Sequence, residues 1–140
     1  MHDRKVGYII REQRPVILPE RETIRQACRR MSRRRVGAVL VCATGRRLVG
    51  VFTGRDAVRV LAEGKDPAHT TLADSMTRDP ASVGPDCTAI EALRTMRDRG
   101  FRHLPVVDGE KIVGIVSRGD FKGLELDRLE EDSLLAERVW

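Results

Sequence analysis

The 140-residue sequence has few aromatic residues and no long apolar run. Aromatic residues make up 4% of the chain, so its core must consist mainly of aliphatic side chains. No apolar run approaches the roughly 18 residues that a transmembrane helix needs. The charged start of the chain is not followed by the apolar segment of a secretory signal. We therefore expect a globular, cytoplasmic protein without a membrane contact.

Cysteine and histidine are scarce and scattered. The three cysteines, Cys28, Cys42 and Cys87, form no C-x-x-C pair, which predicts small buried residues in a reducing compartment. The three histidines lie far apart, and no metal-binding cluster occurs. The phosphate-binding P-loop sequence and the nucleophile elbow of hydrolases are also absent. These absences predict no metal site, no catalytic residues, no required cofactor and no enzyme activity.

The basic residues are mostly arginine. Lysine and arginine number 26 against 21 acidic residues, which gives a formal net charge of +5. The lysines are Lys5, Lys65, Lys111 and Lys122. Because the planar guanidinium group suits phosphates and carboxylates, this composition favours an anionic partner of unspecified size.

The sequence repeats itself once. Residues 15–56 align with residues 80–120 at a shift of 65, which falls to 64 after one deletion in a turn. Identical residues include Thr23 and Thr88, Met31 and Met96, and Asp56 and Asp120. Two copies of about 60 residues are too few for a solenoid, so we expect them to pack on each other about a pseudo-twofold axis.

Each copy predicts the order β-α-β-β-α. Extended segments at 16–18 and 82–83 precede helices that open with the capping-box sequences Thr23-x-x-Gln26 and Thr88-x-x-Glu91. Strands are expected at 38–42 and 48–53, and at 104–107 and 112–117, with a second helix beginning near Asp56 or Asp120. The predicted fold class is therefore α/β (α+β).

These elements define a single module over residues 1–140. The repeats span 7–64 and 72–124, with a polar linker at 65–71. The segment Val6 to Ile10 is expected to pack as a lead-in to the first copy. Residues 125–140 alternate acidic and apolar side chains, which predicts an amphipathic helix that either closes the core or contacts a partner.

Two short motifs occupy equivalent places: Gly50-Val-Phe-Thr53-Gly-Arg-Asp56 and Gly114-Ile-Val-Ser117-Arg-Gly-Asp120. Each sets a hydroxyl and a carboxylate three residues apart where a strand turns into a helix. One interpretation is helix capping alone, in which case asparagine should replace either aspartate at little cost in stability. The other is ligand binding, with a phosphate near the helix start and a ribose diol on the carboxylate.

The ordered, doubled set of motifs resembles a tandem pair of CBS domains, together called a Bateman module. The resemblance covers residues 7–124. It includes the Thr-x-x-Ala helix openings, the segment Arg102-His103-Leu104-Pro105-Val106-Val107-Asp108, the lead-in Asp74-Ser-Met-Thr-Arg-Asp-Pro80 and both Gly-h-h-Thr/Ser-x-x-Asp motifs, where h is apolar. Such modules bind adenosine-containing ligands, AMP, ADP, ATP or S-adenosylmethionine, in clefts between the two copies.

Carried over by residue, the resemblance implies two ligand sites. Asp56 and Asp120 would each hold a ribose, with Thr53 and Ser117 near ribose or phosphate. Segments around Ile17 and Val83 would line the adenine pockets.

Basic residues that would reach phosphates occur only in the second copy. They are Arg102, His103 and Arg118, and the aligned first-copy residues are Gly37, Ala38 and Gly54. This difference argues against equal occupancy of the two sites.

An arginine-rich helix face provides an alternative function. Four arginines spaced four residues apart lie opposite the apolar stripe of the first helix: Arg21, Arg25, Arg29 and Arg33. The simplest interpretation is a solvated face without a binding role. The alternative interpretations are a nucleic-acid patch or a contact with an acidic partner protein. No aromatic residues interleave for base stacking, which disfavours nucleic acid.

The sequence therefore predicts a non-catalytic sensor of adenine nucleotides. We expect a C2 homodimer that signals ligand binding to an unidentified effector protein. The sequence leaves open which adenosine ligand binds and which site it occupies.

Overall fold

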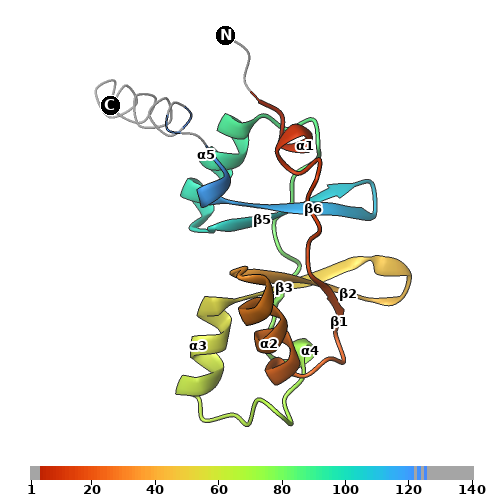
Figure 1. The fold of residues 1–140 in the computed structure, drawn as a ribbon, viewed down its shortest axis with the longest axis vertical. Helices are drawn as coiled ribbons and strands as arrows, with labels where there is room; N and C mark the ends of the chain where they lie inside the picture. Colours follow the sequence, from red (N-terminus) through yellow and green to blue (C-terminus); the bar gives the residue numbers. More distant parts are fainter. Residues whose placement is uncertain (1–3, 122, 124, 126–140) are drawn as a thin grey trace. The chain divides into compact units, whose positions relative to one another are not determined.

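The computed structural model describes residues 4–121, 123 and 125. Its contacts divide these residues into two compact units (Figure 1). We call residues 14–81 with 109–112 the Thr53 unit, after its motif. The Ser117 unit comprises the described residues of 1–13, 82–108 and 113–140.

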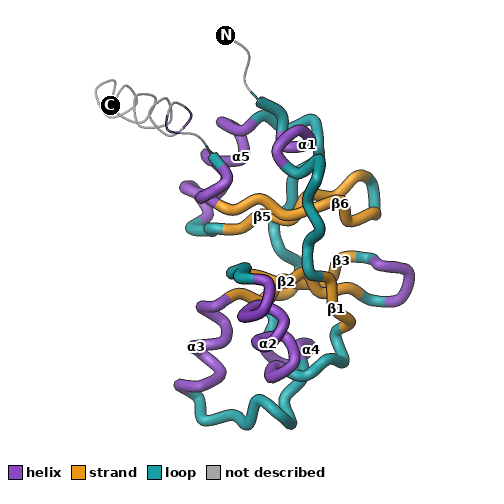
Figure 2. Tube along the Cα trace, in the orientation of Figure 1, coloured by secondary structure: helices purple, strands orange, loops and turns teal. Residues whose placement is uncertain are grey.

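The Thr53 unit is a four-stranded sheet with helices on one side (Figure 2). Its strand order is β1-β2-β3-β4, with β1 parallel to β2 and the remaining neighbours antiparallel. The elements are β1 Ile17–Pro19, α2 Ile24–Arg34, β2 Ala38–Cys42, the 3-10 turn η1 Thr44–Arg46, β3 Leu48–Thr53, α3 Gly54–Ala62, α4 Leu72–Ser75 and β4 Thr77–Arg78. Aliphatic side chains and Phe52 form the core, as the composition predicts.

The Ser117 unit repeats this plan with fewer strand residues. Its elements are α1 Val6–Ile9, α5 Ala89–Arg99, β5 His103–Asp108, β6 Lys111–Ser117 and the 3-10 turn η2 Arg118–Asp120. The strand predicted at 82–83 is only an isolated parallel bridge between Val83 and Val106. The helix predicted to begin near Asp120 is a 3-10 turn over Arg118–Asp120, with helical backbone again at residues 123 and 125.

The short helices α1 and α4 are exchanged between the sequence repeats: each packs on the repeat to which it does not belong. The N–H groups of Val6 and Gly7 in α1 donate to carbonyls of the second copy, at Cys87 (2.8 Å) and Pro85 (2.8 Å). The expectation that Val6 to Ile10 packs on the first copy is therefore wrong. The aligned contacts in the other unit bring α4, which begins the second copy, onto the Glu22 and Glu20 carbonyls of the first copy at 2.8 and 2.9 Å.

This exchange follows from the need to satisfy helix starts. The first N–H of α2 donates to the Thr70 carbonyl, and that of α5 donates to the Arg4 carbonyl. Thr88 and Glu91 form the complete capping box predicted for α5. At α2 only half forms, because Thr23 Oγ1 accepts from the Gln26 N–H while the Glu22 carboxylate accepts from the Thr23 N–H.

The cysteines are less buried than predicted. All three are free and half-buried. Burial raises the pKa of the Cys87 thiol to about 11, and the nearby Glu91 carboxylate adds to the shift. The Cys87 thiol is therefore protonated at neutral pH and of low nucleophilicity.

Within the part of the chain that the structure describes, no helix is long and apolar enough to span a bilayer. The predicted amphipathic helix at 125–140 lies outside the described residues except for Glu125.

Candidate functional site

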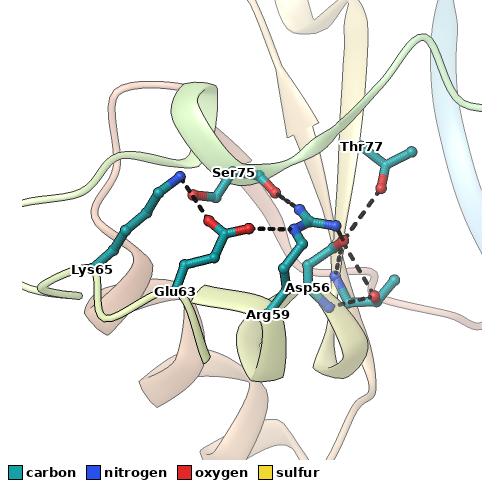
Figure 3. A network of polar contacts seen from close by, with 7 residues as sticks. Asp56, Arg59, Glu63, Lys65, Ser75 and Thr77 are labelled. Atoms are coloured by element: carbon teal, nitrogen blue, oxygen red, sulfur yellow. Dashed lines mark hydrogen bonds and ion pairs between the residues drawn. The ribbon is translucent and has the colours of Figure 1, made fainter. Parts of the chain in front are cut away.

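The first motif forms a buried polar network at the junction of β3 and α3 (Figure 3). The N–H and the hydroxyl of Thr53 both donate to Oδ2 of Asp56, at 2.9 and 3.2 Å. The Asp56 N–H donates back to Thr53 Oγ1 at 3.3 Å, which completes a capping box. Thr53 is therefore the N-cap residue, and Asp56 is the third helical residue rather than the cap that the sequence suggested.

The other oxygen of Asp56 is also occupied. Arg59 Nη1 lies 3.1 Å from Oδ1, one helical turn along α3, and the Thr77 hydroxyl makes a longer contact of 3.4 Å with the same atom. The Arg59 guanidinium is held in turn by the Ser75 carbonyl at 2.6 Å and by Glu63 at 3.9 Å. Asp56 is 4% exposed, so this carboxylate is a fully partnered structural group.

The second motif has the same local geometry in a more open setting. The N–H and hydroxyl of Ser117 donate to Oδ2 of Asp120 at 2.7 and 3.1 Å. Asp120 is exposed, and no described residue donates a hydrogen bond to its Oδ1 atom. Capping therefore uses one oxygen of this carboxylate and leaves the other available.

The predicted phosphate-binding residues gather near the second motif. His103 begins β5, Ser117 ends β6, and the Arg118 N–H donates to the Arg102 carbonyl at 3.0 Å. Arg102 and Arg118 are exposed. Partial burial lowers the pKa of His103, and the Arg102 charge adds to this effect while the Asp120 charge opposes it.

The three aligned positions in the Thr53 unit carry no basic side chain. Gly37 lies directly before β2, Ala38 is the first residue of β2, and Gly54 is the first residue of α3. At these aligned positions the two motifs therefore differ in charge.

The two predicted adenine-lining residues hold equivalent positions in their units. Ile17 lies in β1 and pairs in parallel with Leu40 of β2. Val83 accepts from Val107 N–H and donates to the Pro105 carbonyl, both at 3.0 Å, beside β5. Both residues are half-buried.

Sequence reasoning missed Arg59, Thr77 and Arg4. An i,i+3 pair of Asp56 and Arg59 can be read from the helix spacing, whereas the Thr77 contact requires the exchanged β4 segment. Arg4 binds Glu125 through Nη2 at 2.6 Å and Nε at 3.1 Å, and also donates to the Asp120 carbonyl at 3.2 Å. Among the described residues, no cluster of three histidine, cysteine or acidic side chains could hold a metal ion.

Comparison with known proteins identifies the class to which this fold and these motifs belong. The model of the CBS domain matches twice, at residues 6–63 and 72–126. The chain therefore belongs to the CBS domain family, as a pair of these domains.

Individual relatives agree with this assignment. The CBS domain-containing protein CBSCBSPB2 of Arabidopsis thaliana is 43% identical over 108 residues, which are 76% of this chain and 20% of that protein. A 17.7 kDa protein of Acidianus ambivalens is 34% identical over 124 residues, 88% of this chain and 74% of that one. The chain spans about a fifth of the length of the first of these relatives.

A solved structure shares the fold and carries a ligand. The CBS domain protein PAE2072 from Pyrobaculum aerophilum, complexed with AMP, superimposes with a TM-score of 0.82 at 27% identity. The match covers 91% of this chain and 98% of that one.

Proposed function

We propose that this chain is a non-catalytic regulatory module that binds an adenosine-containing ligand. The candidates are AMP, ADP, ATP and S-adenosylmethionine, and the proposed ligand-binding carboxylate is Asp120. The AMP complex of a structural relative supports the ligand class. Binding would be read by an effector protein through a change in the population of two states of the module.

The open second motif is the observation that carries this proposal. A vicinal diol donates two hydrogen bonds, and a carboxylate with a free oxygen is a suitable acceptor. The exposed oxygen of Asp120 lies in the same unit as Arg102, His103 and Arg118, whose donors suit a ligand phosphate. Thr53 and Asp56 resemble this arrangement in sequence, but the nearby Arg59 guanidinium is already paired with Asp56, and the positions aligned with Arg102, His103 and Arg118 carry no basic side chain.

The test begins with the ligand that the purified protein carries. Mass spectrometry of small molecules released from the protein is expected to detect an adenosine compound. Calorimetric titration of AMP, ADP and ATP should show affinity that changes with the number of phosphates, and Arg118→Ala should reduce that dependence. An empty protein that binds none of the three compounds at millimolar concentration would refute the proposal.

We also propose a C2-symmetric homodimer in the cytoplasm. Val58 and Leu61 on α3 expose 65% and 68% of their surface. A groove of about 410 Å³ beside them is lined mainly by apolar side chains of α2 and α3. Burial of these groups against a second copy would stabilise a dimer. Sedimentation at micromolar concentration should give twice the 15.7 kDa chain mass, and a purely monomeric species would contradict this.

The arginine-rich face supports a second candidate function, nucleic-acid binding. Arg25, Arg29 and Arg33 are exposed on α2, whereas Arg21, also exposed, lies in the turn before the helix begins and not on the predicted helix face. We rank this candidate lower, because electrostatic binding without base stacking is weak at physiological salt. A submicromolar, sequence-dependent complex that charge reversal at Arg25, Arg29 and Arg33 abolishes would overturn the ranking.

A further inference from the structure

The two motif carboxylates differ in what surrounds their second oxygen. In both, Oδ2 accepts the N–H and hydroxyl of the capping residue, Thr53 or Ser117. At Asp56, Oδ1 faces the Arg59 guanidinium at 3.1 Å and the Thr77 hydroxyl at 3.4 Å. A ligand hydroxyl approaching Asp56 would need the same lone pairs that these donors already use.

The second copy lacks both donors. At the repeat shift of 64, Arg59 aligns with Gly123, which has no side chain. No described residue donates a hydrogen bond to Oδ1 of Asp120, so no side chain there takes the place of Thr77. Arg4 lies nearby, but it binds the Glu125 carboxylate and only the backbone carbonyl of Asp120.

Arg59 is also held firmly in the conformation that blocks Asp56. The Ser75 carbonyl accepts from its Nη2 atom at 2.6 Å, and Glu63 lies 3.9 Å from its Nε atom (Figure 3). Glu63 itself pairs with Lys65 at 3.1 Å. A ligand would have to break this charge-assisted contact with the buried carboxylate, while the half-exposed guanidinium would keep its contacts with Ser75 and Glu63.

From these contacts we infer that Arg59 is a specificity-determining residue that closes the first motif to adenosine ligands from within the chain. The inference rests on the proposed function, and it assigns ligand binding to the Ser117–Asp120 motif alone. The protein would bind one ligand per chain although it carries two copies of the motif.

The test follows the backbone amides of Thr53 and Ser117 by NMR during titration with AMP. In the wild-type protein the Ser117 amide should shift and saturate, while the Thr53 amide shows no binding curve of its own. In Arg59→Gln the Thr53 amide should gain a saturable response, at least about tenfold stronger than in the wild type, because a charged hydrogen bond is removed. Arg59→Lys keeps the positive charge, and its Thr53 amide should respond less than that of Arg59→Gln.

Arg30→Gln is the matched control. It makes the same charge change on an exposed residue of α2 in the same unit, and the Thr53 amide of this variant should show no binding response. Saturation of Thr53 with the same dissociation constant as Ser117 in the wild type overturns the inference but leaves the proposed function standing. A folded Arg59→Gln variant whose Thr53 amide shows no response to AMP also overturns the inference. A wild-type protein that carries no adenosine compound and responds at no amide to AMP, ADP or ATP contradicts the proposed function itself.

Discussion

The motifs Thr53–Asp56 and Ser117–Asp120 share a sequence pattern, a capping geometry and an origin in duplication, but they differ in chemical availability. Asp56 is buried with donors on both oxygens, whereas Asp120 is exposed with one oxygen unassigned among the described residues. The difference arises outside the motif, at Arg59 and at Thr77 of the exchanged β4 segment. The local cap is thus the same in both copies, while neighbouring side chains leave one carboxylate fully partnered and the other exposed.

The basic residues follow the same division. Arg102, His103 and Arg118 all belong to the unit with the open carboxylate, and glycine or alanine takes their places in the other. An exposed carboxylate and three basic side chains therefore occur together in one unit.

The largest effect should separate the two aspartates by stability. Asp56→Ala removes the acceptor of the capping box and the carboxylate that pairs with Arg59, so we expect a loss of about 3 kcal/mol in the free energy of unfolding. Asp120→Ala removes only an exposed capping box and should lower the free energy of unfolding by about 1 kcal/mol. Urea denaturation of both variants measures this difference, and equal losses would contradict the structural role of Asp56.

A second comparison concerns the segments that the repeats exchange. A Cβ atom at Gly50 would lie 2.5 Å from Met76 Sδ and 2.9 Å from the Thr77 carbonyl. At Gly114 it would lie 2.8 Å from Gln13 Oε1 and 2.8 Å from Ile10 Cδ1. Alanine at either position should destabilise by roughly 2 kcal/mol through overpacking.

The Gly50→Ala variant should cost more than Gly114→Ala, because a backbone carbonyl yields less than a side chain. Thermal melting compares the two variants, with Gly54→Ala as a control, since a Cβ atom there meets nothing within 4 Å. Unchanged melting temperatures for both Gly50→Ala and Gly114→Ala would contradict the close packing of the exchanged segments.

The sequence was sufficient to predict the local elements. Capping residues such as Thr88, the apolar stripe of α5 and the strand ending at Thr53 depend on neighbours a few positions away, and the structure contains all three. The doubled motif was enough to suggest the CBS domain family, which the family model confirms.

The sequence was insufficient wherever a long-range contact determines the position of a helix or the surroundings of a side chain. The position of α1 depends on hydrogen bonds to Pro85 and Cys87, about 80 residues away, which no local pattern encodes. Helix capping alone predicts that asparagine can replace Asp56 and Asp120 equally well. That prediction did not include the ion pair between Asp56 and Arg59. Asparagine at 56 would lose that charge, so only position 120 should tolerate the change without a large loss of stability.

The smallest predicted effect is the pH dependence that His103 contributes. Burial lowers its pKa below the ordinary value of 6.5, so the folded protein holds the neutral ring while the unfolded chain takes up a proton more readily. Its contribution to stability is therefore complete above pH 6.5 and declines as the pH falls through the lowered pKa.

The His103→Gln variant should show a shallower loss of stability between about pH 6.5 and pH 5 than the wild type, by less than about 1 kcal/mol. Melting curves across this range measure it, with His69→Gln as a comparison at an exposed histidine. Identical slopes for wild type and His103→Gln would contradict the assigned direction of the shift.

The most direct test of the central claim is calorimetric titration of AMP into Asp120→Asn and Asp56→Asn beside the wild type. The account predicts that Asp120→Asn lowers the affinity about ten- to a hundredfold, the value of a charge-assisted hydrogen bond, while its melting temperature stays near that of the wild type. Asp56→Asn should melt at a lower temperature yet keep its affinity within about threefold, because its carboxylate has no ligand to lose. Loss of AMP binding in Asp56→Asn with full retention in Asp120→Asn would contradict the account.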